Sequence, residues 1–233
     1  LCLTFLLDWY AKHGTPGDLR FVCCDGHPSV DQFRGLGQLA PGALCEIWSQ
    51  FSPVTPEILS FGSRCWSAFT DADPTALWQI TVEGTPEIPV AADAFRRQLR
   101  ELPGEKSGLS FTEELMLQVL RDHGSMSAAN LFRRYTLEYE PLVFMGDLGF
   151  RQCVLMPMSA GSAPAIRMAT SQEDEDWWRS TTIELTPCGS ALLAGDADWF
   201  DIASVNRWVG GVQVKSGAPV WRRQKKTGAP AMI

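Results

Sequence analysis

The densest group of residues that could do chemistry lies at positions 23–29, where two adjacent cysteines, Cys23 and Cys24, precede Asp25, Gly26, His27 and Ser29. The apolar run before them, residues 19–24, predicts a short strand. Ligands of α/β sheets bind at the carboxyl ends of strands, so we predict that Asp25, Gly26, His27 and Ser29 form a ligand-binding loop. Two simpler interpretations compete. An Asp-Gly pair is first of all a turn, and cysteines at the end of a buried strand are usually small core residues unless a base such as His27 activates them.

Other site chemistries lack their sequence patterns. His13, His27 and His123 are far apart and the paired cysteines are adjacent, which does not fit a zinc site. The chain contains no Gly-x-Ser-x-Gly and no Gly-Lys-Ser/Thr sequence, and Gly35-Leu-Gly37 lacks the third glycine of a dinucleotide-binding loop. We therefore expect no metal site, predict no cofactor and assign no catalytic residue.

Charge is unevenly distributed along the chain. The whole chain has a net charge of −7, and the part from Arg207 to the end contributes +6, so residues 1–206 carry −13. The acidic body would repel a phosphate backbone, whereas the basic end could bind a polyanion or stay solvated. The candidate polyanion-binding residues are Arg207, Lys215, Arg222, Arg223, Lys225 and Lys226.

Composition places the chain among globular proteins. It has 233 residues, of which 45% are apolar and 20% are charged. No apolar run approaches the roughly 18 residues needed to cross a bilayer, so we expect no membrane association. The seven cysteines are odd in number and irregularly spaced, which favours reduced thiols and a cytoplasmic location. The sequence starts at Leu1 and shows no signal peptide, so we expect it to begin inside a longer gene product.

The first half predicts an α/β region followed by helices. Helical spacing of apolar residues over 1–12 predicts a buried helix, and the strand at 19–24 would follow it as the remnant of an α/β layer. Thr55-Pro56-Glu57 is typical of a helix start. A further helix carries Phe95, Leu99 and Leu102 on one face and three arginines (Arg96, Arg97 and Arg100) on the other, which we interpret as a solvated face rather than a phosphate-binding row. Pro103-Gly104 would end this first domain, residues 1–104.

The second half, residues 105–233, predicts a winged-helix-like domain. Ser110-Phe-Thr-Glu113 has the spacing of a capping box, and three short helices follow, the third running from Asp147 to Leu155 and stopped by Pro157. Two candidate strands, 165–169 and 181–185, then complete the outline of a winged helix-turn-helix. A helix around 190–193 comes next, and a C-terminal hairpin is predicted to pair residues 212–215 with 220–222 across Ser216–Pro219.

A charge test argues against DNA binding by this domain. Residues 108–190 contain eleven acidic and six basic side chains, and the candidate recognition helix carries only Arg151. DNA-binding proteins owe much of their affinity to neutralised phosphates, and the wing loop at Glu173–Asp176 would repel them. A protein-binding or structural winged helix is therefore favoured.

Several segments in fixed order resemble a known family. They are Phe33–Leu39, Trp66–Phe69, Pro89–Pro103, Gly108–Glu113, Phe144–Phe150, Leu185–Gly189, Arg207–Val212 and Val220–Arg222. Together they resemble the bacterial proteins catalogued as domain-of-unknown-function family 1835. Because family members begin with an α/β segment that is missing here, the resemblance implies a truncated member. Gln213 stands where a histidine is common, and Arg223-Gln224 where an aromatic and an acid are common, which puts a role for those positions in doubt. The family has no established activity.

These observations lead to an expected fold of mixed α/β class, with a truncated N-terminal α/β layer, a helical middle and a winged-helix-like second half that ends in a hairpin. We expect an uncharacterised bacterial protein that works as a non-catalytic binding or regulatory module with a protein partner. The alternative is a nucleotide-binding protein or enzyme whose site lies at the sheet edge near residues 25–29 and in a preceding segment.

Overall fold

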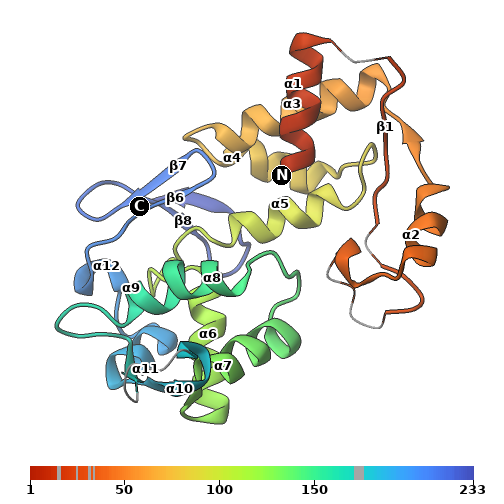
Figure 1. Cartoon of the computed structure of the whole chain (residues 1–233). Coiled ribbons are helices and arrows are strands. Elements are labelled where there is room, and N and C mark those ends of the chain that lie inside the picture. Colours follow the sequence, from red (N-terminus) through yellow and green to blue (C-terminus); the bar gives the residue numbers. More distant parts are fainter. Residues whose placement is uncertain (15–16, 25, 31–32, 34, 171–175) are drawn as a thin grey trace. The chain divides into compact units, whose positions relative to one another are not determined.

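A computed structural model describes residues 1–14, 17–24, 26–30, 33, 35–170 and 176–233 (Figure 1). Helices and small antiparallel sheets make up the fold, which confirms the predicted mixed α/β class. The chain forms two compact units, Leu1–Arg96 and Arg97–Ile233. The sequence prediction placed the division after residue 104, at the Pro-Gly pair beyond the helix that carries the three arginines. Among the described helices, none is both long enough and apolar enough to span a membrane.

The first unit is mainly helical. Its elements are α1 (Cys2–His13), β1 (Arg20–Phe21), the 3₁₀-helix η1 (Leu36–Gln38), α2 (Pro41–Trp48), β2 (Ser52–Pro53), α3 (Pro56–Thr70), α4 (Thr75–Glu83) and α5 (Ala91–Leu99), the last of which continues into the second unit. Helix α1 packs along α3 at Gly62, where an added Cβ would lie 2.2 Å from Cβ of Leu7. Thr55 caps α3 by accepting the N–H of Ile58 at 3.4 Å, as its sequence position predicts.

Two predictions for this unit need correction. Helix α1 is buried on one face only: Leu7 lies in the core, whereas Leu6 is exposed. The strand predicted at 19–24 is reduced to Arg20–Phe21, which pairs antiparallel with Ser52–Pro53. One further hydrogen bond, from the N–H of Val54 to the carbonyl of Leu19 at 2.9 Å, continues the pairing. Because the two strands run antiparallel, they do not form a parallel α/β layer.

The buried thiol of Cys65 predicts a pH dependence of stability. Burial, reinforced by the charge of Glu87 and opposed by that of Arg64, raises its pKa from 9.0 to about 11. Between these values the unfolded chain loses the proton while the folded chain keeps it, so stability falls as pH rises. We expect the free energy of unfolding to fall by about 2 kcal/mol between pH 8.5 and 11. Cys65→Ala should abolish this fall when denaturant unfolding is measured across that pH range. The same change at the exposed Cys45 should leave the profile unaltered; equal profiles for Cys65→Ala and the native protein would contradict the prediction.

The second unit starts with a helical layer and a small sheet. Its first elements are α6 (Phe111–His123), β3 (Met126–Ser127), α7 (Ala128–Arg134), the π-helix η2 (Tyr135–Tyr139), α8 (Asp147–Phe150), the π-helix η3 (Arg151–Leu155), α9 (Met156–Met158), β4 (Ile166–Thr170), α10 (Trp177–Ser180) and β5 (Thr181–Leu185). The strands form one antiparallel sheet in the order β3-β5-β4. Tyr135, Phe150 and Leu131 are fully buried between these elements. The predicted three helices and two strands are therefore present in the expected order.

Pro157 does not stop the third helix as predicted. The helix passes from α8 through η3 into α9 and ends at Met158. Pro157 is the second residue of α9 and lies in the last turn of this continuous helix, so the helix ends one residue beyond it.

The C-terminal part contains two hairpins instead of the one predicted. The remaining elements are α11 (Pro187–Ala194), α12 (Trp199–Ile202), β6 (Asn206–Val209), β7 (Val212–Lys215), β8 (Trp221–Arg223) and β9 (Pro230–Met232). β7 pairs with β6 and β8 pairs with β9, so the predicted pairing of 212–215 with 220–222 is wrong. The two consecutive glycines 210 and 211 make the tighter turn between β6 and β7, with Gly210 at a φ of 60° that favours glycine.

The arginine face of α5 is not solvated as predicted. Arg96 donates to Asp93 and to the carbonyl of Thr81, but the side chain of Arg97 is only 5% exposed. Arg100 is half-buried against the ring of Phe111, and burial together with the nearby positive charges of Arg223 and Arg97 lowers its pKa to about 10. Helical spacing indicated which residues share a face but not that acidic and aromatic side chains would cover it.

Candidate functional site

The second unit encloses a cavity of about 840 Å³. The N-terminal end of α6 contributes Ser110 and Glu113, the π-helix η3 contributes Cys153 and Val154, and the whole of strand β6 lies along it. Phe144 and Trp199 are among its apolar lining residues. Small-molecule and peptide sites are of this size and combine apolar walls with a few polar groups.

An ion pair between the partly exposed Arg207 and the buried Glu113 supplies polar groups of this cavity. Nη1 of Arg207 donates to Oε1 of Glu113 at 2.7 Å. The side chain of Glu113 is 2% exposed, and its second oxygen accepts the backbone N–H of Ser110 at 2.7 Å as part of the capping box. The sequence therefore predicted the capping box correctly, and the structure adds a guanidinium to it.

Arg207 keeps unused hydrogen-bond donors. Its Nε and Nη2 atoms are buried and have no hydrogen-bond partner among the described residues. Burial disfavours the charged guanidinium, but the charge and hydrogen bond of Glu113 and the charge of Glu101 outweigh this, so the pKa of Arg207 is raised. The group stays cationic. Arg222 and Arg223 also have an unpartnered Nε, but neither of them lines this cavity.

A second ionic network lies behind the cavity wall. Glu101, which lines the cavity, accepts from Nη1 of Arg97 at 2.7 Å and from the hydroxyl of Thr112 at 2.7 Å. Arg97 also donates two hydrogen bonds to the buried Glu140. Arg100 interacts electrostatically with Arg97 and Glu140 and belongs to the same group of charges. The three guanidinium groups of Arg97, Arg100 and Arg207 thus balance the three carboxylates.

The π-helix η3 presents Cys153 to the cavity. Its thiol is exposed, and the next residue, Val154, is buried and also lines the cavity. Such π-helical insertions occur frequently at functional sites because they rotate side chains away from the regular helical positions. Cys153 is therefore placed where its reactivity reports on the occupancy of the cavity.

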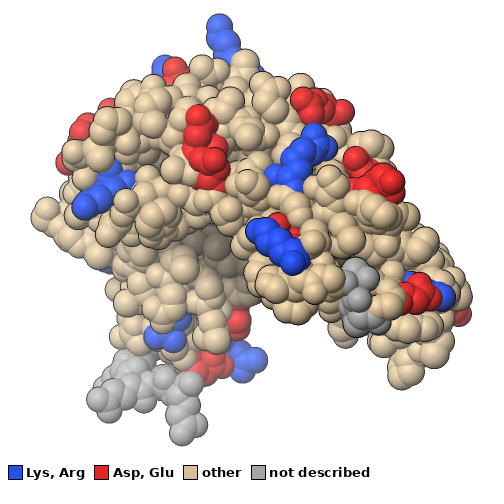
Figure 2. Space-filling model, turned by 90° about the horizontal axis from the view of Figure 1, so that it is seen from above, with Lys and Arg blue, Asp and Glu red and all other residues tan. Residues whose placement is uncertain are grey.

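The predicted polyanion-binding residues do not act as one cluster. Arg207 pairs with Glu113, Arg222 pairs with Asp198, and Arg223 donates to Glu114 at 2.9 Å. Lys215, Lys225 and Lys226 are exposed. Figure 2 shows one face of the molecule, on which Lys and Arg side chains occur singly among Asp and Glu.

The predicted ligand loop forms a turn in its described part. Asp25 lies outside the described residues, and Gly26 has open space around it. Nδ1 of His27 lies 2.7 Å from the hydroxyl of Ser29 and accepts the N–H of Ser29 at 3.2 Å, and His27 forms a backbone bridge with Val30. Nε2 of His27 lies 3.8 Å from Glu46, beyond hydrogen-bond distance. A serine, a histidine and a carboxylate thus come together, but the short contacts are those within a turn.

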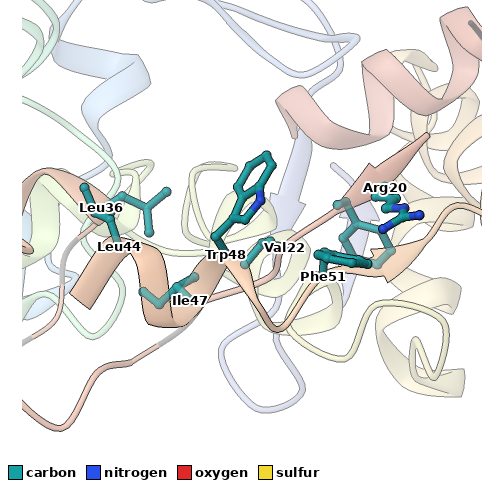
Figure 3. Close-up of a pocket in the computed structure, with 8 residues that line it drawn as sticks. Arg20, Val22, Leu36, Leu44, Ile47, Trp48 and Phe51 are labelled. Atoms are coloured by element: carbon teal, nitrogen blue, oxygen red, sulfur yellow. The ribbon is translucent and has the colours of Figure 1, made fainter. Parts of the chain in front are cut away.

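A smaller cavity of about 310 Å³ lies in the first unit and is mostly apolar (Figure 3). Leu44, Ile47 and Trp48 come from α2, and Arg20 comes from β1. The guanidinium of Arg20 is already paired with Asp18 and lies 4.3 Å from the centre of the Phe51 ring. The guanidinium of Arg20 therefore has an acceptor, whereas two donor atoms of Arg207 in the larger cavity have none in the part of the chain that the structure describes.

Comparison with models of protein families, with curated proteins and with solved structures yields no match for this chain. Among the described residues, no group of three or more histidine, cysteine or acidic side chains could hold a metal ion. The site is therefore argued from its own geometry. Sequence reasoning had identified Arg207 as one of six cations and Glu113 as a helix cap, but the two residues lie 94 positions apart and no local pattern connects them.

Proposed function

We propose that this protein is a non-catalytic binding module whose ligand occupies the cavity beside Arg207 and Glu113. The observation that carries the proposal is the pair of buried donor atoms of Arg207, Nε and Nη2, which lack acceptors at the wall of a large cavity. Leaving a buried donor unsatisfied costs about 1–3 kcal/mol. Both atoms are shielded from the cavity while the side chain of Arg207, which is 27% exposed, keeps this conformation. A ligand in the cavity recovers that cost when the side chain turns to meet its acceptor atoms.

The same proposal includes a winged-helix-like second unit. Helix, short strand, two helices and a two-stranded hairpin follow one another, and the short strand joins the hairpin in the order β3-β5-β4. This order is typical of winged helix-turn-helix domains. Membership in the domain-of-unknown-function family 1835 remains a further proposal that rests on the sequence motifs, as does a cytoplasmic location, which rests on the cysteine pattern.

Protein or small-molecule binding is favoured over DNA binding. In the helix that would enter the groove, Arg151 lies over the ring of Trp177 at 4.0 Å. The exposed residues of this helix include Leu148, at 67% exposure, and Met156. Three of the six C-terminal cations are engaged by carboxylates, so few remain for the phosphate contacts on which DNA affinity depends.

The charges around the cavity favour a neutral acceptor in the ligand. Glu101, Glu113 and Glu140 are already balanced by Arg97, Arg100 and Arg207. A ligand carboxylate would add a fourth negative charge near them, whereas an amide carbonyl accepts from Arg207 without repulsion. The supported ligand class is thus an uncharged molecule with apolar groups and amide oxygens.

Protection of Cys153 tests the proposal. We expect N-acetylphenylalaninamide, an uncharged amide with one aromatic ring, to slow alkylation of Cys153 by iodoacetamide in a saturable way, while Cys45 reacts at an unchanged rate. Arg207→Lys keeps a cation for Glu113 but removes Nε and Nη2, so it should weaken protection about fivefold or more. Peptide mapping by mass spectrometry follows both thiols in one sample.

Arg223→Lys is the matched control, because it makes the same change in another ion-paired arginine outside the cavity. We expect it to retain native protection. Equal protection in Arg207→Lys and the native protein would overturn the proposal, and so would no protection at any concentration. A saturable thermal shift with ATP, lost in His27→Ala, would instead favour the alternative of a nucleotide site at residues 26–29.

A further inference from the structure

Strand β6 has an unpaired edge. Among the described strands, only β7 pairs with it, with Arg207 opposite Val214 and Val209 opposite Val212. The carbonyl of Val205 accepts the N–H of Ser216 at 2.9 Å. Because hydrogen-bonded pairs alternate along an antiparallel ladder, Arg207 and Val209 also bond to β7. The N–H and C=O groups of Asn206 and Trp208 therefore point to the opposite edge.

The large cavity runs along this unpaired edge. Consecutive residues 205–209 all line it, including Val205 and Val209, which face the core, and Asn206 and Trp208, which are exposed. Neighbouring side chains of a strand lie on opposite faces, so a cavity that touches both sets lies at the edge rather than against one face. No residue of β7 lines the cavity, which places it on the side of β6 away from β7.

We propose that the occupant is an extended, uncharged peptide segment of a partner protein, which adds to β6 as a further strand. This inference rests on the proposed function and names its ligand. Addition of a strand to an exposed sheet edge is an established mode of peptide recognition, in which main-chain hydrogen bonds supply affinity and side-chain pockets supply specificity. Here the edge amides of Asn206 and Trp208 supply the main-chain hydrogen bonds, and the cavity supplies the side-chain pocket.

Each requirement of such a peptide has a counterpart in the cavity. Four residues of an added strand extend about 13 Å, which matches the length of β6. A peptide carbonyl or side-chain amide can accept from Nε and Nη2 of Arg207 once that side chain turns toward the cavity, because both atoms are shielded in this conformation. The ring of Trp208, 64% exposed, and that of Phe144 offer apolar contacts to alternate side chains. Because Glu113 already neutralises Arg207, an acidic residue at that position would add an uncompensated negative charge.

The probe is acetyl-Gly-Val-Gln-Val-Gln-Ser-amide, a neutral version of residues 211–216, which already pair with β6 on its other edge. We expect it to protect Cys153 from iodoacetamide, with Cys45 as the internal control. A peptide of the same length with Glu at both glutamine positions should protect about tenfold less.

Two N-methylated versions of the probe test the strand pairing without altering the protein. One carries N-methyl groups at the second and fourth residues, and the other carries them at the third and fifth. Since successive N–H groups of a strand point to opposite edges, one version should lose about tenfold or more in protection and the other should keep most of it. Equal losses in both versions, or no loss in either, would overturn strand addition.

A pair of protein variants provides the second test. Asn206→Pro removes an edge N–H that does not bond to β7, a position where proline is tolerated, whereas Asn206→Ala removes only the side chain. We expect the proline variant to lose about tenfold in protection by the peptide and the alanine variant to stay within about twofold.

These measurements separate two kinds of failure. Protection by N-acetylphenylalaninamide without any by the peptide would leave the binding function and refute the extended peptide as its ligand. Absence of protection by either compound would refute both. A concentration-dependent dimer that Asn206→Pro abolishes, with no peptide binding, would show instead that a second copy of the chain occupies the edge.

Discussion

Replacing Arg97 with methionine is expected to lower the free energy of unfolding by about 3–5 kcal/mol. Arg97 donates from Nε and Nη2 to the two oxygens of Glu140 at 2.8 and 2.6 Å. The side chain of Glu140 is 0% exposed, so removal of the guanidinium leaves a buried carboxylate without its counterion. Denaturant unfolding at neutral pH, followed by far-UV circular dichroism, measures the loss.

The exposed pair Arg134–Glu138 provides the matched control. It is a contact between residues four apart on a helix, with a distance of 2.8 Å, and such pairs contribute only about 0.3–0.5 kcal/mol. Arg134→Met should therefore have a small effect. The double variant Arg97→Met/Glu140→Leu removes both buried charges and should recover much of the lost stability. A loss below about 1 kcal/mol in Arg97→Met would show that Glu140 does not depend on this partner.

Burial of Glu140 also affects its neighbour Tyr135. The hydroxyl of Tyr135 donates to Oε2 of Glu140 at 2.8 Å. Burial of the phenol and the negative charge of Glu140 raise the pKa of Tyr135. Arg97, Glu140 and Tyr135 thus form one network, and substitutions within it should not be additive.

The substitution Gly189→Ala is expected to destabilise the protein by about 2–4 kcal/mol. An added Cβ would lie 2.2 Å from the carbonyl oxygen of Ala165 and 2.7 Å from Cδ1 of Leu185. Ala165 is also held in place, because its carbonyl accepts the backbone N–H of Thr186 and the hydroxyl of the same residue. The clash is therefore with an anchored backbone rather than with a flexible side chain.

Gly42→Ala is the matched control, with the opposite expected sign. Gly42 lies in the first turn of α2, and an added Cβ there meets no atom within 4 Å. Alanine should stabilise this helix by about 0.5–1 kcal/mol, because glycine loses more conformational entropy on folding. Thermal unfolding of both variants measures the difference, and a Gly189→Ala protein as stable as the native one would contradict the close approach of α11 to Ala165.

The sequence predicted correctly those features that arise within a few residues. The capping box Ser110–Glu113 and the cap at Thr55 depend on side chains that reach the nearest backbone N–H groups, so their spacing is sufficient to identify them. The three helices and two strands predicted between 111 and 185 follow from the hydrophobic period and from breaks in it, whereas the short elements β3 and α10 were not predicted. The succession of helix and strand patterns likewise indicated the mixed α/β class, which the structure confirms.

Predictions that required choosing between distant partners were less successful. The turn at Ser216–Pro219 was a reasonable hairpin candidate, but Gly210-Gly211 provided a tighter connection and β7 paired with β6 instead of β8. Arg97 has the same helical environment as Arg96, yet only Arg97 meets a buried glutamate 43 residues further on. Local spacing contains no information about such encounters.

In the candidate site, too, some features could be predicted from the sequence and others depended on the fold. Residue types alone established that the chain has acidic helix caps, a basic C-terminal part and no recognisable catalytic motif. Which cation would meet which carboxylate depended on folding, because the energy of an ion pair is determined by distance and burial rather than by position in the sequence. The three-dimensional arrangement brought Arg207 to Glu113, left two of its donors without acceptors, and placed the unpaired edge of β6 along the cavity.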